Sequence, residues 1–168
     1  MLLALTGFMG SGKTSVGRIV ADALGCPFLD LDEIIERSEG RSIPEIFSLQ
    51  GEEGFRKLEV SALRSVVGKY AGGGTAVLAL GGGTVTIPGA ATLLQEKTIC
   101  IYLKASPETL ESRLEGQSAS RPLLQDGTSI SERLASREKL YQEAAHIILE
   151  TDDLSPEQVA DEIIISCL

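Results

Sequence analysis

The sequence has few of the residues that build disulfide frameworks and protein metal sites. Its 168 residues include three cysteines and one histidine. Cys26, Cys100 and Cys167 lie far apart in the sequence and form no C-x-x-C pair, and only His146 is available to complete a metal site with them. Because an odd, scattered set of cysteines is typical of a reducing compartment, we expect a cytoplasmic protein.

Basic residues are also scarce. The chain has 15 lysines and arginines against 24 aspartates and glutamates, which gives a formal net charge of -9. A surface that binds the phosphate backbone of nucleic acid carries a basic stripe, so this composition argues against a nucleic-acid partner. Any anionic ligand must be held by a local cluster of cations.

Long apolar runs are absent as well. Residues 1–5 are apolar, but they have no basic flank and run directly into Thr6 and Gly7. A signal peptide has a basic flank, and a transmembrane helix needs about 20 apolar residues. We therefore expect neither a signal peptide nor a membrane anchor.

Short apolar runs alternate with longer segments of helical periodicity, which is typical of βαβ units. Run 76–80 is apolar throughout, as expected of a parallel strand that helices cover on both faces. The sequence therefore predicts one α/β domain over residues 1–168. The predicted strands are 2–5, 27–29, 76–80, 98–103 and 146–149. The predicted helix N-caps are Ser42, Ser106, Ser129 and Ser155.

A Gly-rich segment follows the first predicted strand. It reads Gly7-Phe8-Met9-Gly10-Ser11-Gly12-Lys13-Thr14 and matches the phosphate-loop pattern G-x-x-x-x-G-K-[ST]. Such glycines let backbone N–H groups turn toward phosphate oxygens, and the positive end of the helix expected to begin near Lys13 adds to the attraction. Lys13 is expected to reach the β- and γ-phosphates and the Thr14 hydroxyl to ligate Mg²⁺. The motif predicts a nucleoside triphosphate site, but it does not separate a kinase from a GTPase or a motor ATPase. The expected nucleotide contacts are Gly10, Ser11, Gly12, Lys13, Thr14 and Ser15.

Two aspartates follow the second predicted strand. Many P-loop NTPases carry a Mg²⁺-associated Asp at the end of a later strand, but run 76–80 ends in Gly81-Gly82-Gly83 with no acid. Asp30 and Asp32 supply carboxylates instead, and in an extended chain residues two apart point the same way. The two carboxylates repel one another unless a metal–nucleotide or a polar ligand lies between them. The alternative is an acidic N-cap for a helix that starts near Glu33.

The combination of motifs resembles the shikimate kinases. Besides the phosphate loop and Asp30-Leu31-Asp32, the chain contains Phe55-Arg56-x-x-Glu59, Gly81-Gly82-Gly83, Arg121-Pro122-Leu123-Leu124 and Arg137-x-x-x-Tyr141 in the order and spacing of that family. The resemblance covers nearly the whole chain. It implies a P-loop NTPase fold of the adenylate-kinase-like type, with a five-stranded parallel sheet flanked by helices. It also implies a substrate-binding region at about residues 31–62 and a mobile lid at about residues 115–128.

The resemblance implies roles for the residues around the phosphates. Asp30 would lie near Mg²⁺ together with Thr14. Asp32 would bind the shikimate hydroxyls and serve as the base or as an orienting group. Arg121, on the lid, would reach the transferring phosphates, so Lys13, Asp32 and Arg121 are the implied catalytic residues. Lys13 and Arg121 are suitable cations for the charge that develops during phosphoryl transfer.

The resemblance also implies a binding site for the substrate carboxylate. Arg56 and Arg137 would hold the carboxylate, for which the planar guanidinium is well suited. Gly81, Gly82 and Gly83 would bring backbone donors to the substrate. Ordinary helical pairs with nearby glutamates are the alternative for both arginines.

The implied reaction is transfer of the γ-phosphoryl group of ATP to the 3-hydroxyl of shikimate, with Mg²⁺, by a monomeric enzyme of aromatic amino-acid biosynthesis. Two alternatives stay open. A related small-molecule kinase, such as a gluconate kinase, shares the phosphate loop and the fold, although Arg56 and Arg137 favour shikimate. A nucleotide-binding protein without catalysis has no need for Asp32 or Arg121. The acidic segment 150–154 departs from the family pattern, so no adenine contact is assigned.

Overall fold

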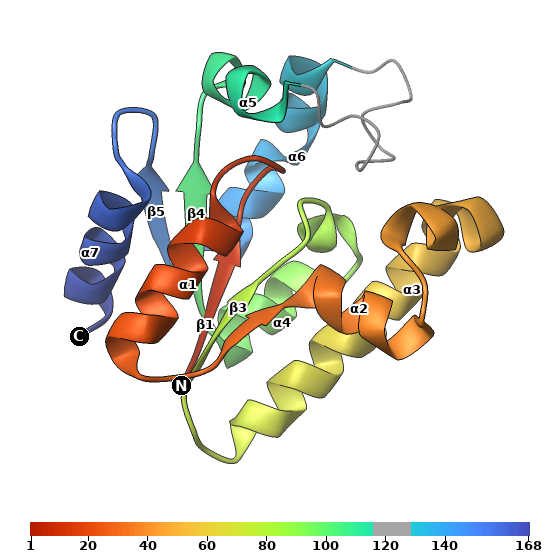
Figure 1. The fold of residues 1–168 in the computed structure, drawn as a ribbon, viewed down its shortest axis with the longest axis horizontal. Coiled ribbons are helices and arrows are strands. Elements are labelled where there is room, and N and C mark those ends of the chain that lie inside the picture. Colours follow the sequence, from red (N-terminus) through yellow and green to blue (C-terminus); the bar gives the residue numbers. More distant parts are fainter. Residues whose placement is uncertain (116–128) are drawn as a thin grey trace.

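The computed structural model describes residues 1–115 and 129–168, and its centre is a five-stranded sheet. The strands are β1 (Leu2–Thr6), β2 (Phe28–Asp30), β3 (Ala76–Ala79), β4 (Ile99–Lys104) and β5 (Ile147–Glu150). All neighbouring strands pair in parallel, in the order β2-β3-β1-β4-β5 (Figure 1). The five predicted strands are confirmed, with each boundary within one residue of the prediction.

Helices connect the strands, as βαβ units require. They are α1 (Lys13–Leu24), α2 (Leu31–Glu39), α3 (Ile43–Ala71), α4 (Ala90–Lys97), α5 (Pro107–Leu114), α6 (Ile130–Ala144) and α7 (Pro156–Cys167), with a short 3₁₀ turn, η1 (Thr84–Thr86), after β3. Each of the four predicted serine caps accepts a hydrogen bond from a backbone N–H in the first turn of its helix. These caps satisfy donors that have no partner within the helix.

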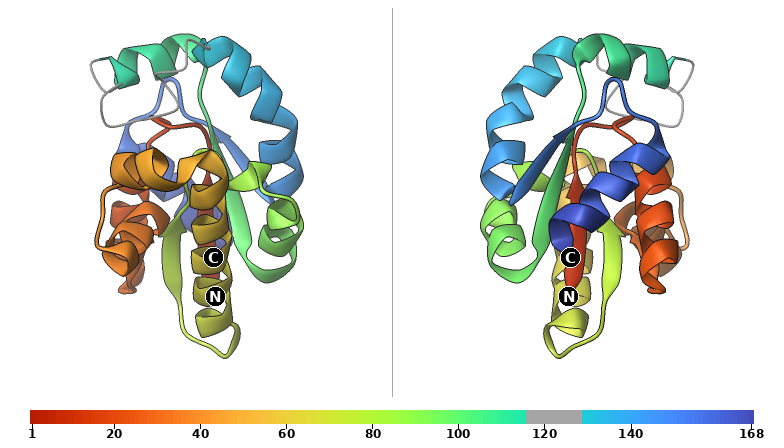
Figure 2. Two further views of the ribbon diagram at one scale, coloured as in Figure 1. Left: turned by 90° about the vertical axis from the view of Figure 1, so that its right-hand side faces the viewer. Right: turned by 90° about the vertical axis from the view of Figure 1, so that its left-hand side faces the viewer.

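The side chains of the sheet alternate between two apolar layers. In β1, Leu2 and Ala4 belong to the layer that includes residues of α2, α3, α4 and α6. Leu3 and Leu5 belong to the other layer, with α1 and α7. Figure 2 shows α3 in front of the sheet in one view and α7 in front of it in the other. Helices thus cover both faces, which explains why β1 and β3 are buried along their whole length.

Helix α3 is interrupted at one position. Gly51 has φ 71° and ψ −177°, which divides α3 into two helical pieces. Residues with a side chain rarely adopt a positive φ, so this break favours glycine. The second piece packs Phe55 and Leu63 into the core, and it carries Arg56 and Glu59 to the loop that follows β3.

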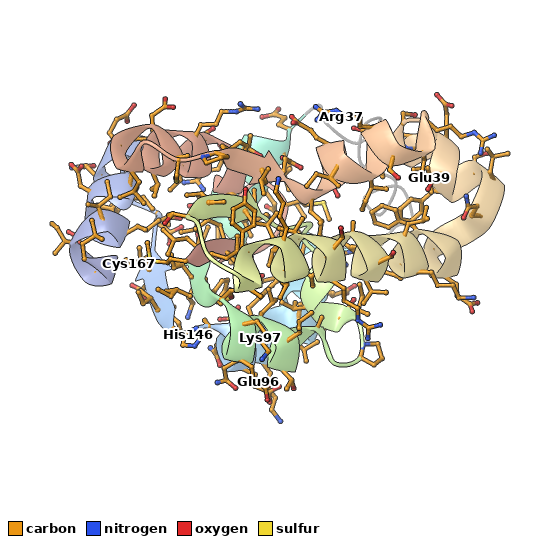
Figure 3. All side chains as sticks on the ribbon, turned by 90° about the horizontal axis from the view of Figure 1, so that it is seen from below. Arg37, Glu39, Glu96, Lys97, His146 and Cys167 are labelled. Atoms are coloured by element: carbon orange, nitrogen blue, oxygen red, sulfur yellow. The ribbon has the colours of Figure 1, made fainter. Side chains whose placement is uncertain are left out.

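The carboxyl ends of the strands meet at one edge of the sheet, at the top of Figure 1. The phosphate loop follows β1 there, Asp30 ends β2, and the three glycines follow β3. Figure 3 looks from below at the opposite edge, where Glu96 and Lys97 close α4. The phosphate loop, Asp30 and the three glycines therefore lie together at the carboxyl edge.

No helix among the described residues combines the length and the apolar character needed to span a bilayer.

Candidate active site

The loop between β1 and α1 is shaped to receive phosphate. Gly10 and Gly12 have φ values of 83° and 97°, a region in which side chains are strained. Gly12 is the N-cap of α1, and it makes no side-chain cap hydrogen bond to that helix. Lys13 is buried, and its Nζ donates to the carbonyl oxygens of Gly7 (2.7 Å) and Phe8 (2.9 Å). An ammonium and the N-terminus of a helix thus lie together, which stabilises an anion.

Thr14 and Asp30 place two oxygen ligands side by side. The Thr14 hydroxyl donates to Asp30 Oδ2 over 3.2 Å. The other carboxylate oxygen of Asp30 accepts from the N–H groups of Asp32 (2.9 Å) and Glu33 (3.3 Å) and so caps α2. Hydroxyl and carboxylate oxygens are ligands that Mg²⁺ prefers, so this pair fits the predicted ion.

The predicted extended conformation between Asp30 and Asp32 is wrong. Strand β2 ends at Asp30 and α2 begins at Leu31, so the chain is already helical at Asp32. The cause is the cap, since Asp30 accepts the first N–H groups of the helix and starts it before the predicted position near Glu33. The acidic N-cap, the alternative to a ligand role, is therefore present. Asp32 nevertheless reaches the loop after β3, because its Oδ1 lies 3.4 Å from the position of a Cβ built on Gly81.

Close packing explains the three glycines after β3. A Cβ on Gly81 would lie 2.6 Å from Glu59 Oε2, and one on Gly83 would lie 2.3 Å from Arg56 Nη2. A Cβ on Gly82 would lie 3.1 Å from a backbone nitrogen of the phosphate loop. None of the three glycines has a positive φ, so a side chain here would be opposed by crowding rather than by backbone conformation. The loop touches both the phosphate loop and the predicted carboxylate-binding arginine.

Arg56 is held by a buried carboxylate. Its Nη1 donates to Glu59 Oε1 over 2.6 Å, and its Nη2 lies 3.5 Å from the exposed Glu52. Glu59 is fully buried, and its second oxygen accepts from the Thr84 hydroxyl at 2.6 Å. The helical ion pairs considered as the alternative role are thus present. They do not draw Arg56 away from the loop, because its guanidinium lies against Gly83.

Arg137 is a buried cation on α6. Its exposed fraction is 5%. Its Nη1 donates to the Gly82 carbonyl over 3.2 Å, and its guanidinium lies 5.6 Å from the centre of the Phe8 ring. Within residues 1–115 and 129–168 no acidic side chain forms an ion pair with Arg137. Because burying a cation is costly unless an anion pairs with it, the position of Arg137 is suited to an anionic ligand.

Most of the predicted residues line one pocket of about 580 Å³. They are Gly10, Ser11, Gly12, Lys13, Thr14, Ser15, Asp30, Asp32, Gly81 and Gly82. Three predicted residues are not part of this lining: Gly83, Arg56 and Arg137. Gly83 belongs to the loop of residues 81–83, here called the glycine loop, and the two arginines lie against that loop. Arg121 lies outside the described residues, as does the predicted lid except for residue 115.

The pocket also has a wall that sequence analysis did not assign, formed by Arg113, Thr151, Leu154, Pro156 and Val159. Arg113 Nη1 donates to the Gly10 carbonyl over 3.3 Å, which joins α5 to the phosphate loop. The N–H and the hydroxyl of Thr151 both donate to the Lys104 carbonyl, at 2.9 and 3.1 Å. The sequence contained a signal for this wall, because Ser155 and Pro156 begin a helix shortly after a strand that ends at the same edge of the sheet.

The acidic character of segment 150–154 has a structural explanation. Asp152 accepts a hydrogen bond from the Ser106 N–H at 2.8 Å, and this bond lowers the pKa of its carboxyl group. The carboxylate thereby fastens the loop after β5 to the start of α5. The residues of this loop that line the pocket, Thr151 and Leu154, are uncharged.

A phosphate loop between β1 and α1, at the carboxyl edge of an all-parallel sheet, defines a P-loop NTPase-like protein. The family model for shikimate kinase matches residues 9–168, almost the entire sequence. The chain belongs to the shikimate kinase family.

Individual relatives agree with this assignment. The chain is 41% identical over 167 residues to the shikimate kinase of Symbiobacterium thermophilum, an alignment that covers 97% of this chain and 94% of the relative. The structure of Acinetobacter baumannii shikimate kinase in complex with shikimate matches with a TM-score of 0.89 and 37% identity, covering 97% of this chain and 90% of the other. Shikimate kinase from Aquifex aeolicus matches with a TM-score of 0.85 and 34% identity over 99% of this chain and 95% of the other. The predicted family and fold class are confirmed.

Proposed function

We propose that the protein transfers the γ-phosphoryl group of ATP to the 3-hydroxyl of shikimate and releases shikimate 3-phosphate and ADP. Family membership supports the reaction, and the A. baumannii relative, solved with shikimate bound, supports the acceptor. One observation carries the assignment here, the buried Arg137 guanidinium beside the phosphate loop. Shikimate is a carboxylate and would provide the anion that this cation requires.

The carboxylate of shikimate would bind at the glycine loop. Arg137 and Arg56 approach this loop from α6 and α3, and the planar guanidinium fork matches a carboxylate. Within residues 1–115 and 129–168, the N–H groups of Gly82 and Gly83 take part in no backbone–backbone hydrogen bond outside the helices and strands. Two cations and two backbone donors at one loop would explain how a chain of net charge -9 binds an anionic acceptor.

ATP would bind with its phosphates in the loop of residues 7–14 and its base against the wall that contains Arg113 and Pro156. Thr14 and Asp30 would hold Mg²⁺, whose charge neutralises the phosphate oxygens. Lys13 would leave the carbonyls that hold it in the loop and donate to the β- and γ-phosphates. Ser11 is buried, and its hydroxyl has no partner within the described part of the chain, so it fits a site that a polar ligand completes.

Asp32 would face the acceptor hydroxyl. Its carboxylate lies beside Gly81, at the boundary between the phosphate loop and the carboxylate site. There it would orient the 3-hydroxyl for in-line attack or accept its proton, and either role lowers the barrier. Arg121 would supply a further cation to the transferred group, and the segment at 115–128 would act as a lid that limits ATP hydrolysis by water.

The proposed location of the protein is the cytoplasm, and its proposed oligomeric state is a monomer. A single kinase domain over residues 1–168 would take its acceptor mainly from the region of about 31–62, which forms α2 and the first part of α3. ATP and shikimate are the proposed partners. The excess of acidic residues supports the absence of a nucleic-acid partner.

A coupled assay of ADP release tests the proposal. The rate of ADP release by purified protein with MgATP is measured in the presence of shikimate, in the presence of gluconate and without an acceptor. Release that depends on shikimate, with shikimate 3-phosphate identified by mass spectrometry, is the expected result. ADP release that depends on gluconate would show that gluconate, and not shikimate, is the acceptor. Confirmed ATP binding without release for either acceptor would favour the nucleotide-binding protein that has lost catalysis.

A further inference from the structure

Two side chains of α6 hold the same carbonyl group. Arg137 and Tyr141 are four residues apart, so they lie on one face of the helix. The Arg137 guanidinium and the Tyr141 hydroxyl both donate to the carbonyl oxygen of Gly82. Tyr141 is fully buried, and this hydrogen bond is directed at the middle residue of the glycine loop. The hydroxyl therefore contacts the site although the ring belongs to the core.

The direction of the Gly82 carbonyl determines the direction of a neighbouring donor. The carbonyl of Gly82 and the N–H of Gly83 belong to one planar peptide unit, and in the trans form they point in opposite directions. No peptide bond among the described residues is cis. When the carbonyl points at α6, the Gly83 N–H points away from α6. That N–H is one of the two proposed donors to the substrate carboxylate.

A peptide between two glycines needs such a restraint. Glycine has no Cβ and changes backbone conformation more easily than other residues, so the unit between Gly82 and Gly83 can rotate at low cost. The peptides on either side are fixed within the chain, because Gly81 accepts from the Thr84 N–H and Gly83 accepts from Thr86. Only the central carbonyl depends on side chains from another element.

We propose that the Tyr141 hydroxyl is a positioning group for the carboxylate end of the substrate site. It fixes the Gly82 carbonyl together with Arg137, and so it sets the direction of the Gly83 N–H. It also leaves the guanidinium of Arg137 free to turn its remaining N–H groups to the ligand, because the carbonyl has a second donor. This inference rests on the proposed function and adds a residue to which sequence analysis gave no role.

The chain offers a matched control. The Tyr141 ring stacks on Tyr102, with 5.0 Å between ring centres and 23° between ring planes. The Tyr102 hydroxyl donates to Glu138 at 2.6 Å instead of to the glycine loop. Changing either tyrosine to phenylalanine keeps the stacked rings and removes one buried hydroxyl. The two variants therefore share the packing effect and differ in the contact with Gly82.

Steady-state kinetics of Tyr141→Phe and Tyr102→Phe test the proposal. For Tyr141→Phe we expect the KM for shikimate to rise roughly five- to tenfold, the scale of one hydrogen bond, with the KM for ATP unchanged. For Tyr102→Phe both KM values should equal those of the wild type. Thermal unfolding of both variants checks that each is folded. An unchanged KM for shikimate in Tyr141→Phe, or an equal rise in Tyr102→Phe, would overturn the proposal.

A substrate analogue separates positioning from a general structural effect. Methyl shikimate lacks the carboxylate charge, so its KM should differ much less between the wild type and Tyr141→Phe. An equal rise for shikimate and its methyl ester would show that Tyr141 does not act at the carboxylate end. Failure of the proposed function is distinguishable, because the wild type itself would then release no ADP in response to shikimate.

Discussion

Adding one methyl group at Gly83 should damage substrate binding while leaving the fold intact. In Gly83→Ala the new Cβ would lie 2.3 Å from Arg56 Nη2, 2.8 Å from its Cζ and 2.9 Å from its Nη1. Ordinary contact begins at 3.4 Å, so the guanidinium must retreat by about 1 Å. Gly83 has φ −107° and ψ 4°, a bridge-region conformation with negative φ that is open to residues with a side chain. The side chain of Arg56 must therefore absorb the change.

The retreat of Arg56 should cost binding energy rather than stability. Its guanidinium is the end of a flexible side chain, and it can keep its ion pair with Glu59 after a small shift. A hydrogen bond to a charged group contributes about 1.5–3 kcal/mol, so losing the contact with the substrate carboxylate corresponds to roughly a 10- to 100-fold rise in the KM for shikimate. The KM for ATP should change little, since Arg56 does not line the nucleotide pocket.

The assay is steady-state kinetics with each substrate varied in turn, combined with thermal unfolding. Gly68→Ala is the control, because it also adds one methyl group, lies in α3 and has nothing within 4 Å of the added Cβ. Alanine is favoured over glycine inside a helix by about 1 kcal/mol, so this variant should keep wild-type kinetics and melt about 2–4 °C higher. If Gly83→Ala kept a wild-type KM for shikimate, the proposed role of Arg56 would be refuted.

Three further predictions use the same assays. Asp32→Asn should bind ATP normally and lose at least about a hundredfold in turnover, the scale of a base or an orienting group; turnover near the wild-type value would remove that role. Lys13→Met should abolish turnover but remain folded by circular dichroism, and normal kinetics would contradict the phosphate-loop assignment. The lowered pKa of Asp152 contributes stability that is complete above its ordinary value of 3.8 and is lost as the pH falls through the folded-state value. Asp152→Asn should therefore melt below the wild type at pH 7, and this difference should shrink as the pH falls below 3.8; a difference independent of pH would contradict the assignment.

The sequence predicted the strands well because parallel strands covered on both faces are continuous apolar runs. Ala76–Ala79 is such a run, and it can be recognised from the residues of that segment alone. The helix starts were equally local, since a serine such as Ser106 caps with its own hydroxyl. The prediction from local sequence was wrong at Asp32, which was expected in an extended chain. One carboxylate oxygen of Asp30 caps the helix that contains Asp32, and the other accepts a hydrogen bond from Thr14.

The pocket wall that was not assigned from the sequence shows a different limit of prediction from a single sequence. Segment 150–154 is acidic and departs from the family pattern, so no adenine contact was assigned to it. In the folded chain Asp152 accepts from Ser106, 46 residues earlier in the sequence, while Thr151 and Leu154 line the pocket. Which side of a loop carries the charge depends on a partner from a distant element, so a single sequence does not provide it.

The glycine loop brings the two halves of the site together. Gly82 leaves room for the backbone of the phosphate loop, and Gly83 leaves room for Arg56. The phosphoryl donor and the acceptor carboxylate would therefore be positioned from opposite sides of a single loop, and a change in its backbone would alter the distance between the reacting groups. Phosphoryl transfer depends mainly on such positioning. This explains why the loop is fixed from outside by Tyr141 and Arg137, and why a hydroxyl group buried in the core should affect the KM for shikimate.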